Sequence, residues 1–318
     1  MKPSAIVMKT MPIMLIRLAV YLVFFLGACI YAAIVIGLAN LLKPDGLGAF
    51  LFLAVFGGGG WGIYRLAREY INYLVKAAHV AIIAELAING SVPDGFNMYA
   101  WGVERVKKQF LAANVLFGLD RLVAGSVRQI QRTLGSIASF LSFIPGLKSL
   151  TDILNLFVDI ILNYVDECIM AMIFLKREEN VWKTAADAIV LYVQNWKTVL
   201  KTGGKLLIFI VVFMLLGFVV FYGMFQAIFT NPQASSGVGG VIAVIITVVF
   251  ALVLKWAVVD SVVMVYMVSN YLQVAYGQQP AYDLYAKVEG MSKKFGDIMG
   301  KAREGMAAGP VAGTGPMG

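Results

Sequence analysis

The sequence has few of the residues that build metal sites or disulfide frameworks. It contains one histidine, His79, and two cysteines, Cys29 and Cys168, in 318 residues. A multi-histidine metal site, a cysteine-rich zinc site and a disulfide network are therefore excluded. The chain also has no nucleotide-binding loop, no Gly-x-Ser-x-Gly nucleophile elbow and no histidine-based catalytic arrangement. We therefore predict that the protein is not an enzyme and binds no cofactor or metal.

Charge is also scarce in this chain. Charged residues make up 14% of it and hydrophobic residues 60%, whereas soluble domains are about a quarter charged. This apolar excess is too large for one water-soluble core of this length. The composition predicts an all-α, polytopic helical membrane protein.

The apolar residues gather in long runs that can cross a bilayer. About 20 helical residues span the hydrocarbon core, and four runs reach that length: 11–42, 47–66, 206–229 and 241–271. We therefore expect an N-terminal two-span hairpin over 1–66 and a C-terminal two-span hairpin over 206–271. Amphipathic interfacial or re-entrant helices should occupy 67–205, followed by a tail over 272–318 that is disordered from about 305.

The distribution of basic residues predicts the orientation. Lys2 and Lys9 precede the first span, and the tail carries five further basic residues. The loop over 230–240 has no charge, and 43–45 carries one charge of each sign. By the positive-inside bias, both termini and the 67–205 segment should be cytoplasmic, with the protein integral to the cell membrane.

A helix predicted over 150–175 carries its polar residues on one face. At 100° per residue, six polar side chains fall within about 120° of the helix circumference. These residues are Asp152, Asn155, Asp159, Asn163, Asp166 and Glu167. At membrane depth such a stripe would line a path for a cation, and at the membrane surface it would be the solvated face of an amphipathic helix.

Two charges interrupt the last apolar run. Lys255 and Asp260 are five residues apart, which is about 140° around an α-helix. We therefore expect that they do not face each other and that each pairs with another helix or a cavity. Asp260 is added on this basis to the candidate cation path.

Basic residues alternate with apolar ones between 98 and 143, namely Arg105, Lys107, Lys108, Arg121, Arg128 and Arg132. This pattern is typical of a helix that lies on anionic lipid headgroups, and equally of a solvated basic face on a cytoplasmic helix. Nucleic-acid binding is not predicted, because acids balance the basic residues and apolar residues disperse them.

A run of four glycines, Gly57, Gly58, Gly59 and Gly60, lies inside the second span. Glycines let two membrane helices approach closely, or they can unwind a helix to expose its carbonyls to an ion. Close packing is the simpler interpretation, and it favours a homo-oligomer.

Three short motifs resemble the C-terminal half of the choline transporter-like family. Asp166-Glu167-Cys168-Ile169-Met170 leads into a helix that ends Gln194-Asn195-Trp196, Gly204-Lys205-Leu206-Leu207 opens a span, and Val259-Asp260-Ser261-Val262 lies in the last span. The similarity covers about 150–285. This chain has fewer spans than that family and no long extracellular loop. The resemblance implies transport of an organic cation, with Asp260 on its path, and a chain that oligomerises to enclose the path.

Two functions are compatible with these patterns. One is a transporter or channel-like protein that passes a cation, such as a small organic cation, along the acidic helix face. The other is an oligomeric membrane scaffold that does not transport and that binds the bilayer surface through its basic helices.

Overall fold

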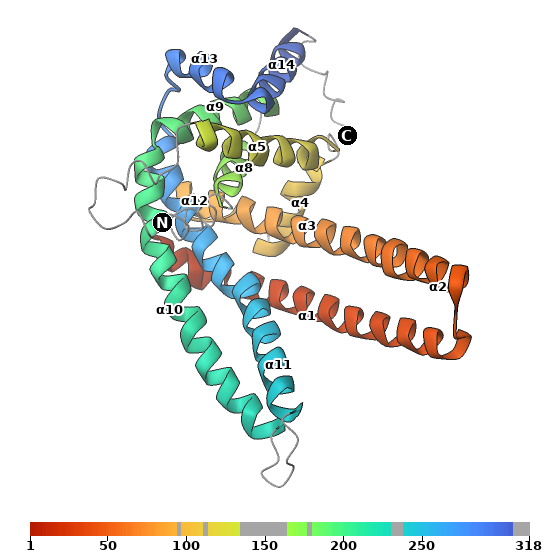
Figure 1. Cartoon of the computed structure of the whole chain (residues 1–318). Coiled ribbons are helices and arrows are strands. Elements are labelled where there is room, and N and C mark those ends of the chain that lie inside the picture. Colours follow the sequence, from red (N-terminus) through yellow and green to blue (C-terminus); the bar gives the residue numbers. More distant parts are fainter. Residues whose placement is uncertain (94–96, 111–113, 134–163, 177–179, 230–237, 308–318) are drawn as a thin grey trace, which may run out of the picture. The chain divides into compact units, whose positions relative to one another are not determined.

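A computed structural model describes the chain except for residues 94–96, 111–113, 134–163, 177–179, 230–237 and 308–318. Every regular element in the described residues is helical (Figure 1). The chain divides into two compact units. Unit 1 contains Met1–Thr10, Ala77–Phe213 and Val262–Gly318, and unit 2 contains Met11–Lys76 and Met214–Ser261.

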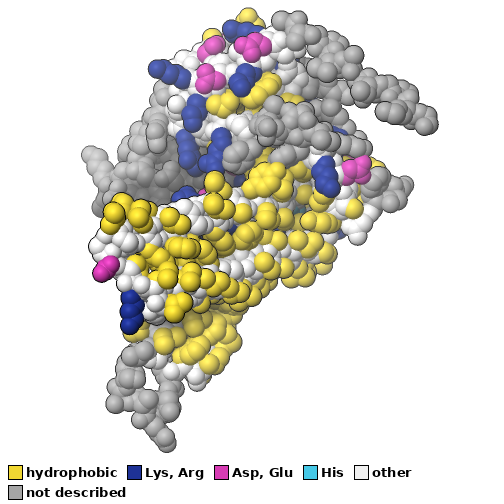
Figure 2. Space-filling view, turned by 90° about the vertical axis from the view of Figure 1, so that its right-hand side faces the viewer, with side chains coloured by type: hydrophobic (Ala, Val, Ile, Leu, Met, Phe, Trp, Pro, Cys, Tyr) yellow, Lys and Arg dark blue, Asp and Glu magenta, His cyan; other side chains and the backbone are white. Residues whose placement is uncertain are grey.

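Four helical segments in the described residues are long and apolar enough to cross a membrane, as predicted. They are Pro3–Leu42, Gly46–Ile88, Trp196–Phe229 and Gly239–Ala275. Their most apolar stretches are largely exposed, and Figure 2 shows hydrophobic side chains over much of the face in view. A surface of this kind, on helices of this length, is typical of membrane-spanning segments. The prediction of an all-α helical membrane protein is therefore confirmed.

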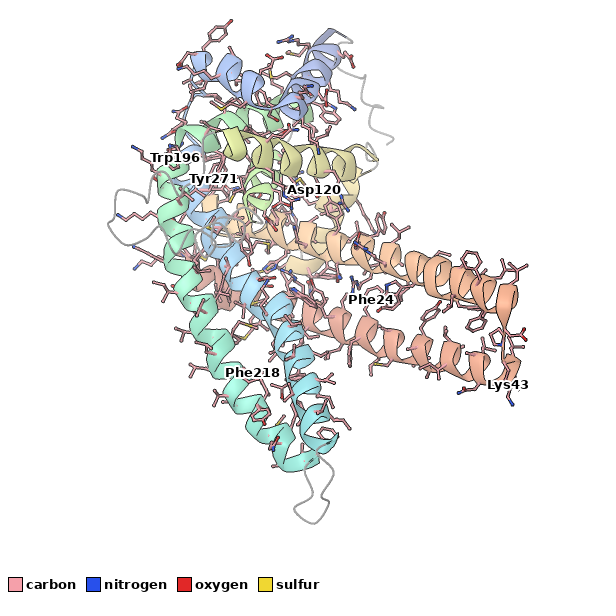
Figure 3. All side chains as sticks on the ribbon, viewed as in Figure 1. Phe24, Lys43, Asp120, Trp196, Phe218 and Tyr271 are labelled. Atoms are coloured by element: carbon pink, nitrogen blue, oxygen red, sulfur yellow. The ribbon has the colours of Figure 1, made fainter. Side chains whose placement is uncertain are left out.

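The first hairpin of unit 2 is formed by α1 (Pro3–Leu42) and by a helix in three parts, α2 (Gly46–Phe52), η1 (Leu53–Gly60) and α3 (Trp61–Ile88). Lys43 and Gly46, with φ of 41° and 45°, make the tight turn between them, and Figure 3 shows Lys43 at this end of α1. Two tyrosine hydroxyls cross the hairpin: Tyr31 donates to the Phe56 carbonyl and Tyr64 to the Phe24 carbonyl. These bonds satisfy polar groups within the hairpin, where lipid offers no partner.

The second hairpin of unit 2 pairs the end of α10 (Trp196–Phe229) with α11 (Val238–Leu254). Phe221 and Phe225 of α10 meet Phe250 of α11 edge to face, with ring centroids 4.8 and 5.9 Å apart. After α11 the chain continues through η3 (Lys255–Val259), a π-helical segment, into α12 (Asp260–Ala275). Gly239–Ala275 is therefore one continuous long helix, and the π-helical interruption η3 lies near the middle of this helix.

Unit 1 is a bundle of shorter helices with its own core. Its helices α5 (Asn114–Thr133), α8 (Val165–Leu175), α9 (Val181–Gln194) and α14 (Lys293–Ala307) pack against one another, and α4 (Met98–Phe110) and α13 (Tyr282–Met291) complete it. Almost every residue of α8 is buried, as is the centre of α9. The end of α3, from Ala77 to Ala87, is also buried. These helices exclude solvent from a shared apolar core, so unit 1 is more than a set of surface helices.

The start of α9 is fixed by a side chain that also holds α14. Asn180 caps α9 by accepting the backbone N–H groups of Trp182 and Lys183, at 2.9 and 3.3 Å. Its amide donates to the Ala302 carbonyl of α14. Lys301 of α14 lies 4.6 Å from the ring centroid of Trp182.

The tail predicted to be disordered from about 305 is helical as far as Ala307, and 308–318 lie outside the described residues.

A pair of glycine substitutions tests the packing of unit 1. A Cβ at Gly102 would lie 2.6 Å from Ile82 and 2.9 Å from the Ala78 carbonyl, whereas one at Gly118 meets nothing within 4 Å. Gly102→Ala should therefore lower the free energy of unfolding by about 1–3 kcal/mol through overpacking against α3. Gly118→Ala should raise it by about 0.5–1 kcal/mol, because alanine is the better helix former.

The measurement is thermal unfolding of the two variants in detergent micelles, followed by circular dichroism. Equal shifts of the midpoint in the two variants would contradict this packing of α4 on α3.

Candidate functional site

The two charges in the last span pair with each other. Lys255 Nζ lies 3.0 Å from Asp260 Oδ1, and the two side chains are 28% and 18% exposed. The expectation that they face apart was wrong, because it assumed a regular α-helix. Residues 255–259 are π-helical, and the Asp260 N–H donates to the Lys255 carbonyl. This i to i+5 hydrogen bond brings residues five apart onto one face of the helix.

A third charged residue, Arg17 of α1, joins the same part of unit 2. Its guanidinium donates to Ser261 Oγ at 2.8 Å and to the Trp256 carbonyl at 3.4 Å. Ser261 in turn donates to the Ala257 carbonyl at 2.6 Å. Only 7% of Arg17 is exposed. We call Arg17, Lys255, Asp260 and Ser261, together with the Trp256 carbonyl, the span cluster.

The patterns considered in the sequence leave out Arg17, so its place in this cluster was not predicted. A signal was present, because Arg17 is followed by about 25 residues without any charge. At 1.5 Å per residue they reach about 37 Å, which is enough to cross the bilayer core. Tyr21, one turn after Arg17, packs on Trp256 with ring centroids 6.0 Å apart. This contact fixes the level at which α1 meets η3.

The other spans carry their first basic residue at a similar distance from their hairpin loop. Counted from that loop, Arg65 and Arg68 come after about 19 and 22 residues, Lys205 after about 24 and Lys255 after about 17. These counts correspond to about 25–36 Å of helix, against a hydrocarbon core of about 30 Å. In each span, the basic residue therefore marks the end of the apolar band opposite the loop.

The predicted acidic stripe falls in three parts of the chain. Asp152, Asn155, Asp159 and Asn163 lie outside the described residues. Asp166 and Glu167 form the first turn of α8 in unit 1, and Glu167 is buried with 4% exposed. Carboxylates in a first turn are stabilised by the helix macrodipole. Asp260, the remaining member, belongs to unit 2.

The buried cysteine next to these acids is chemically unreactive. Cys168 is fully buried in α8. Burial, and then the neighbouring Glu167 and Asp166 carboxylates, raise the pKa of its thiol well above the usual value. A thiol in this state is a poor nucleophile and a poor metal ligand. No group of three or more His, Cys, Asp or Glu side chains that could hold a metal ion occurs among the described residues.

The predicted basic face is only partly a surface. Lys107, Arg121 and Arg128 are exposed on α4 and α5. Arg105, by contrast, donates to the Phe174 carbonyl at the C-terminal end of α8, at 2.8 Å. This bond places a positive charge at the negative end of the α8 dipole. The side chains of Lys108 and Arg132 lie outside the described part of the structure.

The glycine run forms the end of η1, a second π-helical segment. A Cβ at Gly60 would collide with the Tyr31 hydroxyl of α1, whereas Cβ atoms at Gly57 and Gly58 would meet nothing within 4 Å. A Cβ at Gly59 would approach only the Ala54 carbonyl of the same helix. Within the described chain, Gly60 therefore packs against α1, whereas Gly57 and Gly58 face open space on the helix surface.

A buried carboxylate connects α9 to α13 in unit 1. Asp187 accepts hydrogen bonds from Lys183 Nζ at 2.8 Å and from the Tyr285 hydroxyl. Burial, followed by the hydrogen bond to Asp187 and its charge, raises the pKa of Tyr285 above its usual value. The hydroxyl of Tyr271, a residue labelled in Figure 3, donates to the Ala188 carbonyl of α9 at 2.9 Å. These buried polar groups have hydrogen-bond partners in one another, and the core therefore tolerates them.

Comparison with known proteins gives no assignment: no family model matches the chain, and no curated protein or solved structure is significantly similar to it. The resemblance to the choline transporter-like family therefore stays a prediction, carried by the short motifs alone.

Charge variants of the span cluster test whether its charges are coupled. The cluster has two cations and one carboxylate, so Asp260→Asn leaves a net charge of two and Lys255→Met leaves none. Because unpaired charge is costly away from water, Asp260→Asn should lower the free energy of unfolding most, by about 1–3 kcal/mol. Lys255→Met should be milder, and the double variant should be more stable than Asp260→Asn alone.

Thermal unfolding of the wild type and the three variants in detergent micelles checks this order. A double variant less stable than Asp260→Asn, with the two single effects adding, would show that the charges are not coupled.

Proposed function

We propose that the protein is an integral membrane scaffold. Its two span hairpins anchor a cytoplasmic helical domain, unit 1, whose basic face contacts anionic lipid headgroups, and copies of the chain assemble through their glycine-containing spans. The main support is the shared position of the basic residues. Arg17, Arg65, Lys205 and Lys255 each end an apolar band on the side opposite its loop, as expected for four spans with their basic ends cytoplasmic.

The described acidic residues also favour a structural role. Asp260 is neutralised by Lys255 across a π-helical turn, Asp187 is held by Lys183 and Tyr285, and Glu167 lies in the packed first turn of α8. Carboxylates that are paired or packed in this way support a stable fold. A cation path requires carboxylates that can exchange one partner for the passing ion.

The exposed basic side chains of unit 1 support its proposed contact with anionic lipid headgroups. Lys107, Arg121 and Arg128 project from α4 and α5, whose apolar sides are buried in unit 1 at Val106, Leu119, Val123, Val127 and Ile130. Each basic residue near an anionic leaflet contributes about 1 kcal/mol to its attraction. Three such residues strengthen the contact of a domain that its spans already hold at the membrane.

Transport of a cation is the second candidate. Two π-helical segments, η1 and η3, interrupt the spans, and such segments are frequent at functional sites. The polar residues at 152–163 would complete a path in this account. A flux measurement separates the two functions.

The purified full chain in liposomes provides the test. The scaffold account predicts that flux of choline and of K⁺ equals that of protein-free liposomes, and that light scattering in micelles gives a homo-oligomer. Flux that Asp159→Asn abolishes without a change in stability would overturn the scaffold account in favour of transport. A monomer would also contradict it.

Cysteine labelling in cells tests the orientation separately. In a background with Cys29→Ser and Cys168→Ser, Lys43→Cys should react with a membrane-impermeant maleimide in intact cells. Arg128→Cys and Met306→Cys, at exposed positions of unit 1, should react only after permeabilisation. Labelling of Arg128→Cys in intact cells would place unit 1 on the outer side and contradict the proposed orientation.

A further inference from the structure

The span cluster carries one positive charge more than it neutralises. Lys255 is paired with Asp260, but the two partners of Arg17 are the Ser261 hydroxyl and the Trp256 carbonyl, which are both uncharged. In the described part of the chain, no carboxylate lies within ion-pair distance of Arg17. Arg17 is nevertheless buried as a residue, with 7% exposed.

This arrangement calls for an anion. A buried guanidinium is tolerated when a negative charge compensates it, and removing that charge is costly. Guanidinium has five N–H donors, and the hydrogen bonds to Ser261 and Trp256 use two of them. The remaining donors form a fork that suits the oxygens of a phosphate group.

The level of the cluster along the spans identifies the kind of anion. Arg17 and Lys255 both lie where the apolar bands of α1 and α11 end, next to the aromatic pair of Tyr21 and Trp256. Aromatic side chains of this type gather at the height of the lipid headgroups. The anion that a bilayer supplies at this height is a lipid phosphate, and the cytoplasmic leaflet is rich in lipids with net negative charge.

We propose that the span cluster is a binding site for the phosphate of an anionic phospholipid, held between α1 and the η3 turn. Arg17 binds the phosphate, Ser261 and the Trp256 carbonyl orient its guanidinium, and Lys255 provides a second positive charge close by. Asp260 holds Lys255 in place and prevents the site from carrying two uncompensated cations. This inference rests on the proposed orientation of the spans but not on the scaffold function.

The site differs from the basic face of unit 1. The side chains of Lys107, Arg121 and Arg128 are exposed and attract any anionic surface, so their contribution is additive and sensitive to salt. Arg17 is buried and held by two hydrogen bonds, so it should select one lipid molecule at a fixed position.

Lipid-dependent thermal stability of the purified full chain in neutral micelles tests this proposal. A ligand that binds only the folded protein raises its unfolding midpoint with concentration. Phosphatidylglycerol should raise the midpoint of the wild type, whereas phosphatidylcholine and inorganic phosphate should not. Arg17→Gln should weaken the apparent affinity for phosphatidylglycerol about tenfold or more, because it removes a charge-assisted hydrogen-bond donor.

Matched controls separate the site from general charge. Arg65→Gln removes an exposed arginine from the same unit and the same end of the apolar bands, and it should respond to phosphatidylglycerol as the wild type does. The Lys255→Met/Asp260→Asn double variant keeps the net charge of the cluster but removes its second positive charge. It should therefore bind phosphatidylglycerol more weakly than the wild type and more tightly than Arg17→Gln. If Arg17→Gln does not fold, Arg17→Lys retains the charge without the fork and should bind phosphatidylglycerol several-fold more weakly.

Equal stabilisation of the wild type and of the folded Arg17 variant would overturn the proposal. A response to phosphatidylcholine as large as that to phosphatidylglycerol would also overturn it, as would a response to inorganic phosphate alone. The orientation can fail independently, because cysteine labelling measures the side of the membrane and this assay measures lipid selectivity.

Discussion

The fold depends on a requirement that lipid imposes: each polar group in a span must find its partner within the protein or at the membrane surface. The spans of unit 2 meet this requirement through hydrogen bonds between neighbouring helices. Tyr31 and Tyr64 bond to carbonyls across the first hairpin, and Arg17 bonds to Ser261 and to the Trp256 carbonyl at the η3 turn. The apolar bands between these points carry no charge. The charged residues are thus confined to the ends of the spans and to unit 1.

Unit 1 meets the same requirement with different means. Its core is apolar, and several of its buried polar groups form hydrogen bonds with each other or with helix ends. Arg105 donates a hydrogen bond to the last turn of α8, and Asp187 accepts one from Tyr285 of α13. Asn180 caps α9 and also donates a hydrogen bond to α14. These bonds connect segments distant in sequence, so the bundle forms from both halves of the chain. A separately packed unit in the same chain as the spans is the physical basis of the scaffold proposal.

The spans could be predicted from the sequence because each is longer and more apolar than any soluble helix requires. The pairing of Lys255 with Asp260 could not be predicted, because it depends on a π-helical turn that changes the angular spacing, and the residues there are ordinary helix formers. The place of Arg17 could not be predicted because its partners, Ser261 and a carbonyl of η3, are about 240 residues away. Arg105 was predicted at the lipid surface, but its hydrogen bond to α8 arises from tertiary packing. The residues at 152–163 remain a sequence prediction.

The central claim is that the apolar band of α1, from Arg17 to Leu42, crosses the bilayer. Cys29 lies about 12 residues beyond Arg17 and about 13 before Leu42, which puts it about 18–20 Å from either end of the band. It is exposed, whereas Cys168 is buried and its pKa is raised, so a thiol-specific spin label attaches to Cys29. Electron paramagnetic resonance in liposomes should find this label near the bilayer midplane, in contact with oxygen and shielded from a water-soluble nickel complex. A label that the nickel complex relaxes strongly would place Cys29 at the membrane surface and contradict the account.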